Sequence, residues 1–306
     1  MKVPFTYESV EELVGKKLVV SKNMLGDNVF WMEAEVVLSE NGEAGEGEVA
    51  WLVEDGALRI DMGSKGGWYE FNGAEAANGV VRATGMHSVD HGTRRRSVLH
   101  LKAPVGDDFG ICVSSNRDYE KETLPVLAAS LEKAGFDKDR VLVVVGGCKD
   151  EDEGSAYEAE GFSVVRRKAG AMGFTALGDA AGTQGMRYWM LLHDTCTVEP
   201  DFAEKAAALD VGLGPDVVLF MGTDSELGLY SVRHLAKGAF DVEDRPSSIL
   251  SSLMDSAKVV VNAAVKVTTE PERDIYGGGV MRKVMKMGTL GLVKTARGSG
   301  RRRKRP

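Results

Sequence analysis

A histidine, an aspartate and a threonine directly follow a short apolar run, and these side chains could hold a metal ion or a polar ligand. The run is Tyr188–Leu192, and His193, Asp194 and Thr195 come next. Residues 199–201 (Glu-Pro-Asp) are then expected to begin a helix, because proline is favoured in the first turn of a helix. A buried strand followed by polar residues and a helix predicts a ligand site at the carboxyl edge of an α/β sheet.

Further polar and glycine-containing segments are predicted to reach the same edge. Hydroxyls, an amide and a cation follow the apolar run at 109–113, and two glycines follow the β-branched run at 141–145. A stretch of cations and small residues at 166–173 suits a nucleotide phosphate and a close backbone approach. Neither the phosphate-loop signature nor the dinucleotide glycine fingerprint is present. The candidate ligand-binding residues in these segments are Ser114, Ser115, Asn116, Arg117, Gly146, Arg167 and Gly173.

Strands and helices are predicted to alternate from residue 107 onward, which favours βαβ units and a mostly parallel sheet. Strands are expected at 109–116, 140–147, 162–167, 188–192 and 216–222. The apolar spacing predicts a helix over 117–135, with Gly135 as its stop. Residues 229–240 and 247–256 are also expected to be helical.

Residues 1–105 have a different pattern, which predicts a small antiparallel β barrel or sandwich after a short helix at 9–14. Short alternating runs recur about every ten residues. The steps at 54–56 (Glu-Asp-Gly) and 40–42 (Glu-Asn-Gly) are hairpin signals. Trp31, Trp51 and Trp68 fall in these strands. They either fill a small core or stack on sugar rings.

Composition indicates a globular protein with a reduced, cytoplasmic location. Hydrophobic residues make up 43% of the chain and charged residues 27%, and no apolar run reaches membrane-spanning length. The three cysteines lack zinc-site spacing. A net charge of −8 argues against nucleic-acid binding. The basic tail, 293–306, is expected to be a disordered end, and its Arg301–Arg305 run could make weak contact with an anionic membrane surface.

Residues 108 to about 290 resemble a GT-A glycosyltransferase, of the family 2 type that uses nucleotide sugars. The resemblance is carried by ICVSSNRDYEKETLPVLAASL, VLVVVGGCKDEDE, FTALGDAAGTQGMRYWMLLHDTCTVEPDF and DSELGLYSVRHLAKGAFDVEDR. His193, Asp194 and Thr195 occupy the position of the family's D-x-D motif, with one carboxylate instead of two. Residues 146–147 (Gly-Gly) stand where many members have an acidic residue that contacts the nucleobase.

The resemblance implies a GT-A domain over 106–292 that moves a sugar from a UDP- or GDP-linked donor to a glycan, lipid-linked or protein acceptor. It implies that Asp194 and His193 hold Mn²⁺ or Mg²⁺, and that Arg117 or Arg167 faces the leaving diphosphate. The β-domain would bind carbohydrate or position the acceptor. The alternative is a catalytically degenerate domain that binds a glycan or a nucleotide. An inverting member also needs a carboxylate base, and the candidates are Asp244, Asp224 and Glu226.

Overall fold

The computed structural model describes residues 2–23, 29–63, 67–77, 80–90, 95–168, 173–220, 227–237, 257, 260–263, 267–270, 282–287 and 292–297. The chain forms two compact units. Unit 1 comprises residues 1–104, 210–215 and 258–263. Unit 2 comprises residues 105–209, 216–257 and 264–306.

Unit 1 is built on an antiparallel sheet with the order β2-β1-β7-β6-β5-β4-β3, and β16 pairs with β2 in parallel. Asp55 and Gly56 have φ angles of +50° and +77°. They form the two-residue turn between β3 and β4, so this predicted hairpin is confirmed. The elements are α1 (Tyr7–Glu11), β1 (Lys17–Asn23), β2 (Val29–Val37), β3 (Ala50–Glu54), β4 (Ala57–Asp61), β5 (Trp68–Ala77), β6 (Val80–His87), β7 (Ser97–Leu101) and β16 (Val260–Ala263).

The other predicted hairpin, at 40–42, is wrong. Asn41 and Gly42 do turn the chain, with φ angles of +54° and +77°. However, β2 and β3 stand at opposite ends of the antiparallel order, so the turn lies in a connection between two strands that do not pair as a hairpin. The chain just beyond β2 and the chain just before β3 do meet, because Val49 N–H donates to Val37 O at 2.9 Å. The sheet therefore curls towards closure, as the predicted small antiparallel β-domain requires.

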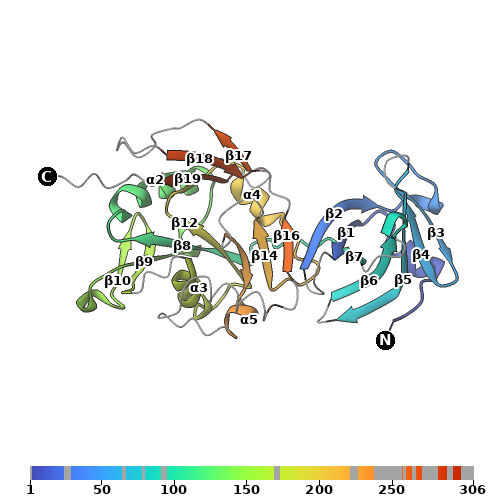
Figure 1. The fold of residues 1–306 in the computed structure, drawn as a ribbon, viewed down its shortest axis with the longest axis horizontal. Coiled ribbons are helices and arrows are strands. Elements are labelled where there is room, and N and C mark those ends of the chain that lie inside the picture. The colour runs from blue at the N-terminus through green and yellow to red at the C-terminus, as the bar shows by residue number, and fades with distance from the viewer. Residues whose placement is uncertain are drawn as a thin grey trace. The chain divides into compact units, whose positions relative to one another are not determined.

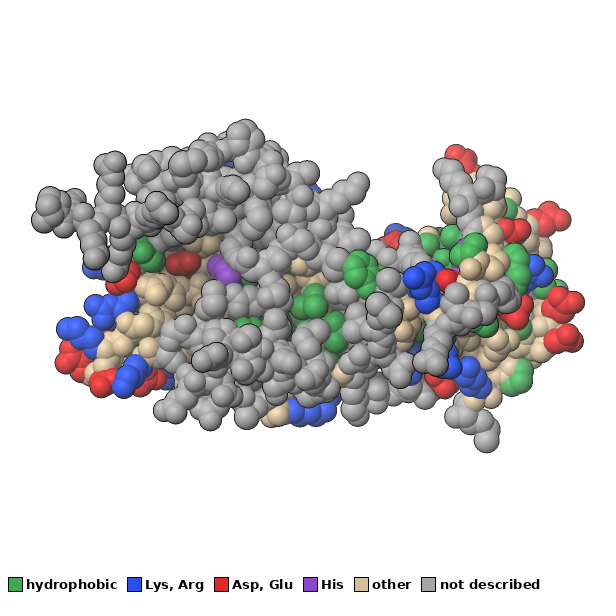
Figure 2. Space-filling model, in the orientation of Figure 1, with side chains coloured by type: hydrophobic (Ala, Val, Ile, Leu, Met, Phe, Trp, Pro, Cys, Tyr) green, Lys and Arg blue, Asp and Glu red, His purple; other side chains and the backbone are tan. Residues whose placement is uncertain are grey.

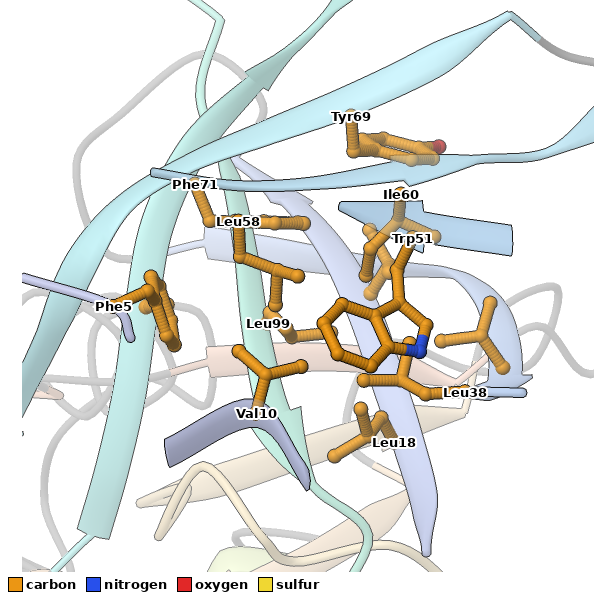
Figure 3. Packing of buried hydrophobic residues seen from close by; sticks show 13 residues of the cluster. Phe5, Val10, Leu18, Leu38, Trp51, Leu58, Ile60, Tyr69, Phe71 and Leu99 are labelled. Carbon is orange, nitrogen blue, oxygen red and sulfur yellow. The ribbon is translucent and has the colours of Figure 1, made fainter. Parts of the chain in front are cut away.

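The inner face of this sheet holds the core of unit 1, which Figure 3 shows in close-up. Alternate side chains of neighbouring strands point inward, because the side-chain period of a strand is two. Trp51 is buried in this core and donates its indole N–H to Ser39 O at 2.8 Å. Trp68 is half-buried, with the Arg59 guanidinium 4.0 Å from its ring centroid. For Trp51 the packing role is therefore the one observed.

Unit 2 contains a mixed sheet with the order β10-β11-β9-β8-β12-β15-β14. Strands β11, β9, β8 and β12 are parallel, while β15 is antiparallel to both of its neighbours. This confirms the predicted α/β fold class. The strands are β8 (Phe109–Asn116), β9 (Val141–Gly146), β10 (Ala156–Ala159), β11 (Phe162–Arg166), β12 (Tyr188–His193), β14 (Val217–Phe220) and β15 (Gly228–Ser231).

Helices α2 (Glu120–Lys133) and α3 (Gly173–Ala181) lie on opposite sides of this sheet (Figure 1). Right-handed crossovers require this arrangement, because α2 leads from β8 to β9 and α3 leads back from β11 to β12 on the other side of β8. Gly135 has a φ of +69° and ends α2, as predicted. Phe136 N–H closes that helix end by donating to Leu131 O at 3.0 Å.

The helix predicted over 229–240 is wrong for its first residues. Gly228–Ser231 form β15, and Val232–Leu235 form the helix α5, while residues 238–240 lie outside the described residues. Strand β15 is fully buried between β12 and β14, and this pairing overrides the local helical pattern. The remaining elements are α4 (Phe202–Ala207) and a second sheet of β13 (Cys196–Val198), β19 (Leu292–Arg297), β18 (Arg282–Met287) and β17 (Val267–Glu270). None of the described helices has the length and apolar character that crossing a membrane requires.

Candidate functional site

The strand order of unit 2 reverses between β8 and β12, and the predicted site residues lie at this reversal. The chain leaves β8 towards β9 on one side, and β12 pairs with β8 on the other. In the parallel ladders, Asn116 is opposite Gly146 and His193 is opposite Ser114. The carboxyl ends of three strands therefore meet here. Ligands of open α/β sheets bind where connections diverge in this way.

Asp194 follows β12 and is held by groups of the neighbouring β8 and α2. Its backbone N–H donates to Ser114 O at 3.0 Å, which extends the ladder by one residue. Its carboxylate Oδ2 accepts hydrogen bonds from Ser115 Oγ at 2.9 Å and from Thr123 Oγ1 at 2.7 Å. Asp194 is 8% exposed. It is a largely desolvated carboxylate in a fixed orientation.

The sequence did not single out Thr123. It lies in the first turns of α2, among the buried residues of that helix. Its signal is a polar residue within the apolar stripe of a helix that directly follows a loop predicted to bind a ligand. Such a side chain must find a hydrogen-bond partner inside the protein.

Asn116 and Arg117 lie beside the glycine loop after β9. Arg117 N–H donates to Gly146 O at 3.2 Å. Gly147 has a φ of +76°, and a β-carbon there would lie 3.7 Å from Asn116 Nδ2. The Arg117 guanidinium is exposed and lies 3.6 Å from Asp118. A donor amide, an exposed cation and a glycine backbone thus adjoin the end of β8.

Arg167, the other predicted phosphate cation, is already bound by carboxylates. Its Nε lies 2.9 Å from Asp179 Oδ2, and its Nη1 lies 3.4 Å from Glu153 Oε1. The hydrogen bond with Asp179 raises the pKa of Arg167, with smaller contributions from Glu153. Basic and acidic side chains also alternate over the end of unit 2 around β10 (Figure 2). An incoming phosphate would have to compete with Asp179.

Gly173, His193 and Thr195 have different surroundings. A β-carbon at Gly173 would lie 2.5 Å from Leu191 Cδ2, so this glycine lets α3 pack closely on β12. His193 is the half-buried last residue of β12. Thr195 is half-buried in the turn that leads into β13. His193 and Thr195 flank Asp194 along the chain, whereas Gly173 contributes to packing.

A buried acid at the start of α2 is a second feature that sequence reasoning missed. Glu120 accepts a hydrogen bond from the Tyr157 hydroxyl at 2.5 Å and pairs with Arg166 at 3.3 Å. Burial, and then the hydrogen bond to Glu120, raise the pKa of Tyr157 to about 12. This cluster joins α2 to β10 and β11.

The described residues do not by themselves make a metal site. Within the described ranges, no group of three or more His, Cys, Asp or Glu side chains could hold a metal ion. The Oδ2 oxygen of Asp194 is also taken up by two hydroxyls. The candidate bases Asp224, Glu226 and Asp244 lie outside the described residues.

No known protein family and no curated protein matches this sequence. Distant structural similarity to S. aureus TarS is found. A structure of TarS residues 1–349 has 15% identity and a TM-score of 0.38, over 52% of this chain and 58% of that one. The same segment in complex with UDP has 13% identity and a TM-score of 0.36, with the same coverage. A further TarS structure has 16% identity and a TM-score of 0.35, over 52% of this chain and 35% of that one. The similarity thus spans little more than half of either 1–349 chain.

The carboxyl edge between β8 and β12 combines three chemical groups that a ligand could contact. Asp194 can accept a hydrogen bond from a hydroxyl group of a ligand, because its carboxylate is held in place by neighbouring donors. The exposed Arg117 can approach a phosphate. Gly147 lets a ligand come close to the backbone after β9. A polyhydroxylated, phosphorylated ligand matches all three.

Proposed function

We propose that unit 2 is a nucleotide-sugar-dependent glycosyltransferase. The observation that carries this proposal is the position of Asp194. A fixed, largely buried carboxylate lies at the strand-order reversal, next to the segment that contains Asn116 and Arg117. The sequence motifs that resemble GT-A enzymes fall on these same strands, β8, β9 and β12.

In the proposed reaction, the bond between the anomeric carbon of the sugar and the diphosphate oxygen breaks, and a bond from an acceptor oxygen to that carbon forms. The acceptor hydroxyl loses its proton to a carboxylate, for which Asp244, Asp224 and Glu226 are the candidates. Arg117 would stabilise the charge that develops on the leaving diphosphate. Asp194 would orient the donor through one of its hydroxyls. Because the described residues do not fit a metal ion, no step is assigned to one.

The second candidate is a domain that binds a nucleotide or a glycan without transfer. Two observations favour it: Asp194 is one carboxylate where two are usual for D-x-D enzymes, and Arg167 is bound by Asp179.

The acceptor in the transfer reaction is a glycan, a lipid-linked sugar or a protein. Unit 1 is proposed to bind carbohydrate or to position that acceptor. Weak membrane contact through the basic tail belongs to the same proposal.

Thermal unfolding with nucleotides tests the proposal. UDP, GDP, CMP, UDP-sugars and GDP-sugars are each added with and without Mn²⁺ to wild type, Asp194→Asn and the exposed control Asp139→Asn. A ligand at about 100 times its Kd adds about 2.7 kcal/mol to the unfolding free energy. We expect a stabilising nucleotide whose effect is lost in Asp194→Asn and kept in Asp139→Asn.

Release of free nucleoside diphosphate from the stabilising donor then separates the two candidates. Acceptor-dependent release supports transfer, whereas binding without release across an acceptor panel supports the binding domain. Absence of stabilisation by every nucleotide would refute the glycosyltransferase and the nucleotide-binding domain, and would leave only the glycan-binding form of the second candidate.

A further inference from the structure

The two hydroxyl groups on Asp194 act on the same oxygen. Ser115 and Thr123 both donate to Oδ2, and no hydrogen bond to Oδ1 is formed within the part of the chain that the structure describes. Ser115 comes from β8 and is 7% exposed, whereas Thr123 comes from α2 and is fully buried. Donors from two different elements therefore fix one end of the carboxylate. The other end is left for a ligand.

Thr123 has a choice of acceptors, and its surroundings decide between them. Its single hydroxyl proton lies between Tyr119 O at 2.9 Å and Asp194 Oδ2 at 2.7 Å. Tyr119 O already accepts the backbone N–H groups of Glu122 and Thr123, both at 3.0 Å. A carbonyl oxygen has two lone pairs, and these two bonds use both. The proton therefore goes to the carboxylate, where a charge-assisted hydrogen bond is stronger.

Backbone geometry adds a third restraint. The Asp194 N–H donates to Ser114 O, so main chain and side chain are both tied to the segment that leads from β8 into α2. Turning the carboxylate away from this position would break two hydrogen bonds to a charged group. The orientation of Oδ1 is thus set before any ligand arrives.

We infer that Thr123 and Ser115 are positioning residues, which hold Asp194 so that Oδ1 accepts a hydrogen bond from a hydroxyl of the nucleotide-sugar donor. This inference rests on the proposed function. Affinity then depends on a buried threonine that does not itself touch the ligand. A site built this way avoids the entropy cost of ordering a mobile carboxylate on binding.

The test uses a crossed pair of substitutions at Thr123, with nucleotide binding measured by calorimetry on the full chain. Thr123→Val removes the hydroxyl and keeps the shape, whereas Thr123→Ser keeps the hydroxyl and removes a methyl group. Thr175→Val on α3 is the control, because Thr175 Oγ1 is buried without a hydrogen-bond partner within the described ranges. The probe is UDP or GDP, whichever stabilises wild type. Ser115→Ala replaces Thr123→Val if the latter fails to fold.

We expect Thr123→Val to raise Kd about tenfold, equivalent to about 1.4 kcal/mol. Thr123→Ser and Thr175→Val should stay close to wild type. If Thr123 served only for packing, Thr123→Ser would have the higher Kd of the two Thr123 variants. That result, or an unchanged Kd in Thr123→Val, overturns the inference while the proposed function stands. Absence of binding by wild type overturns the function, and the inference with it.

Discussion

Asp210 is predicted to control the acid stability of unit 1. This carboxylate lies in the returning segment 210–215 and accepts three hydrogen bonds. His100 Nε2 lies 2.8 Å from Oδ2, and the backbone N–H groups of Ala103 and Gly212 lie 3.0 and 2.9 Å from Oδ1. Burial by itself would raise the pKa of Asp210, but these three donors outweigh it and lower the pKa. Asp210 is therefore ionised at neutral pH, and His100 Nε2 carries the proton that it donates.

The magnitude follows from what each substitution leaves behind. Asp210→Ala removes the acceptor of three donors and should lower the free energy of unfolding by about 2–3 kcal/mol, because the buried His100 side chain is left without its charged acceptor. Asp210→Asn keeps an oxygen for Ala103 and Gly212 and loses the charge opposite His100. Its cost should be about 1–2 kcal/mol at neutral pH.

The pH dependence gives the sharper test. Because the folded-state pKa of Asp210 lies below the unfolded value, its contribution is complete above about pH 5 and is lost as the pH falls through the folded value. Urea unfolding should therefore show the gap between wild type and Asp210→Asn narrowing below about pH 4. The exposed Asp139→Asn variant controls for the loss of one negative charge. Parallel pH profiles for wild type and Asp210→Asn would refute the reasoning.

Two further predictions concern unit 2. Gly228→Ala should lower the free energy of unfolding by about 2–3 kcal/mol, because its β-carbon would lie 2.5 Å from Val218 O of the paired strand. Gly182→Ala is the control, because its β-carbon would lie 3.5 Å from the nearest atom, and urea unfolding should give it a stability near that of wild type. Tyr157→Phe should lower the free energy of unfolding by about 1–2 kcal/mol, because it leaves Glu120 with one hydrogen-bond donor fewer. Since the pKa of Tyr157 is about 12, that cost should be constant between about pH 6 and pH 9, and a cost that vanishes at the upper end would contradict the assignment of the hydrogen bond.

Local sequence signals were sufficient for the strands that carry the site. Strands β8, β9 and β12 are continuous apolar runs that end abruptly in polar or glycine residues, so both the strand and its carboxyl end were predictable. Helix α2 has a regular apolar stripe and a glycine stop. These patterns reflect which residues of a single strand or helix are buried, so they predict each such element correctly by itself.

Features that depend on partners distant in sequence were not predictable in the same way. Strand β15 has the local pattern of a helix, and only its position between β12 and β14 makes it extended. The turn at Asn41 and Gly42 has hairpin chemistry, yet its flanking strands pair with others. The contact of Thr123 with Asp194 joins residues 71 positions apart. No local pattern could show that Arg167 is bound by Asp179.

The order in which the chain visits the two units has a consequence for synthesis on the ribosome. Unit 1 receives residues 210–215 and β16 only after β8 to β12 of unit 2 have been made. While unit 2 emerges, His100 lacks Asp210 and β2 lacks its parallel neighbour. A fragment released at residue 104 would therefore be an incomplete domain with an open sheet edge, prone to association with other chains. We therefore expect chaperones to shield the nascent N-terminal part until translation has passed residue 263.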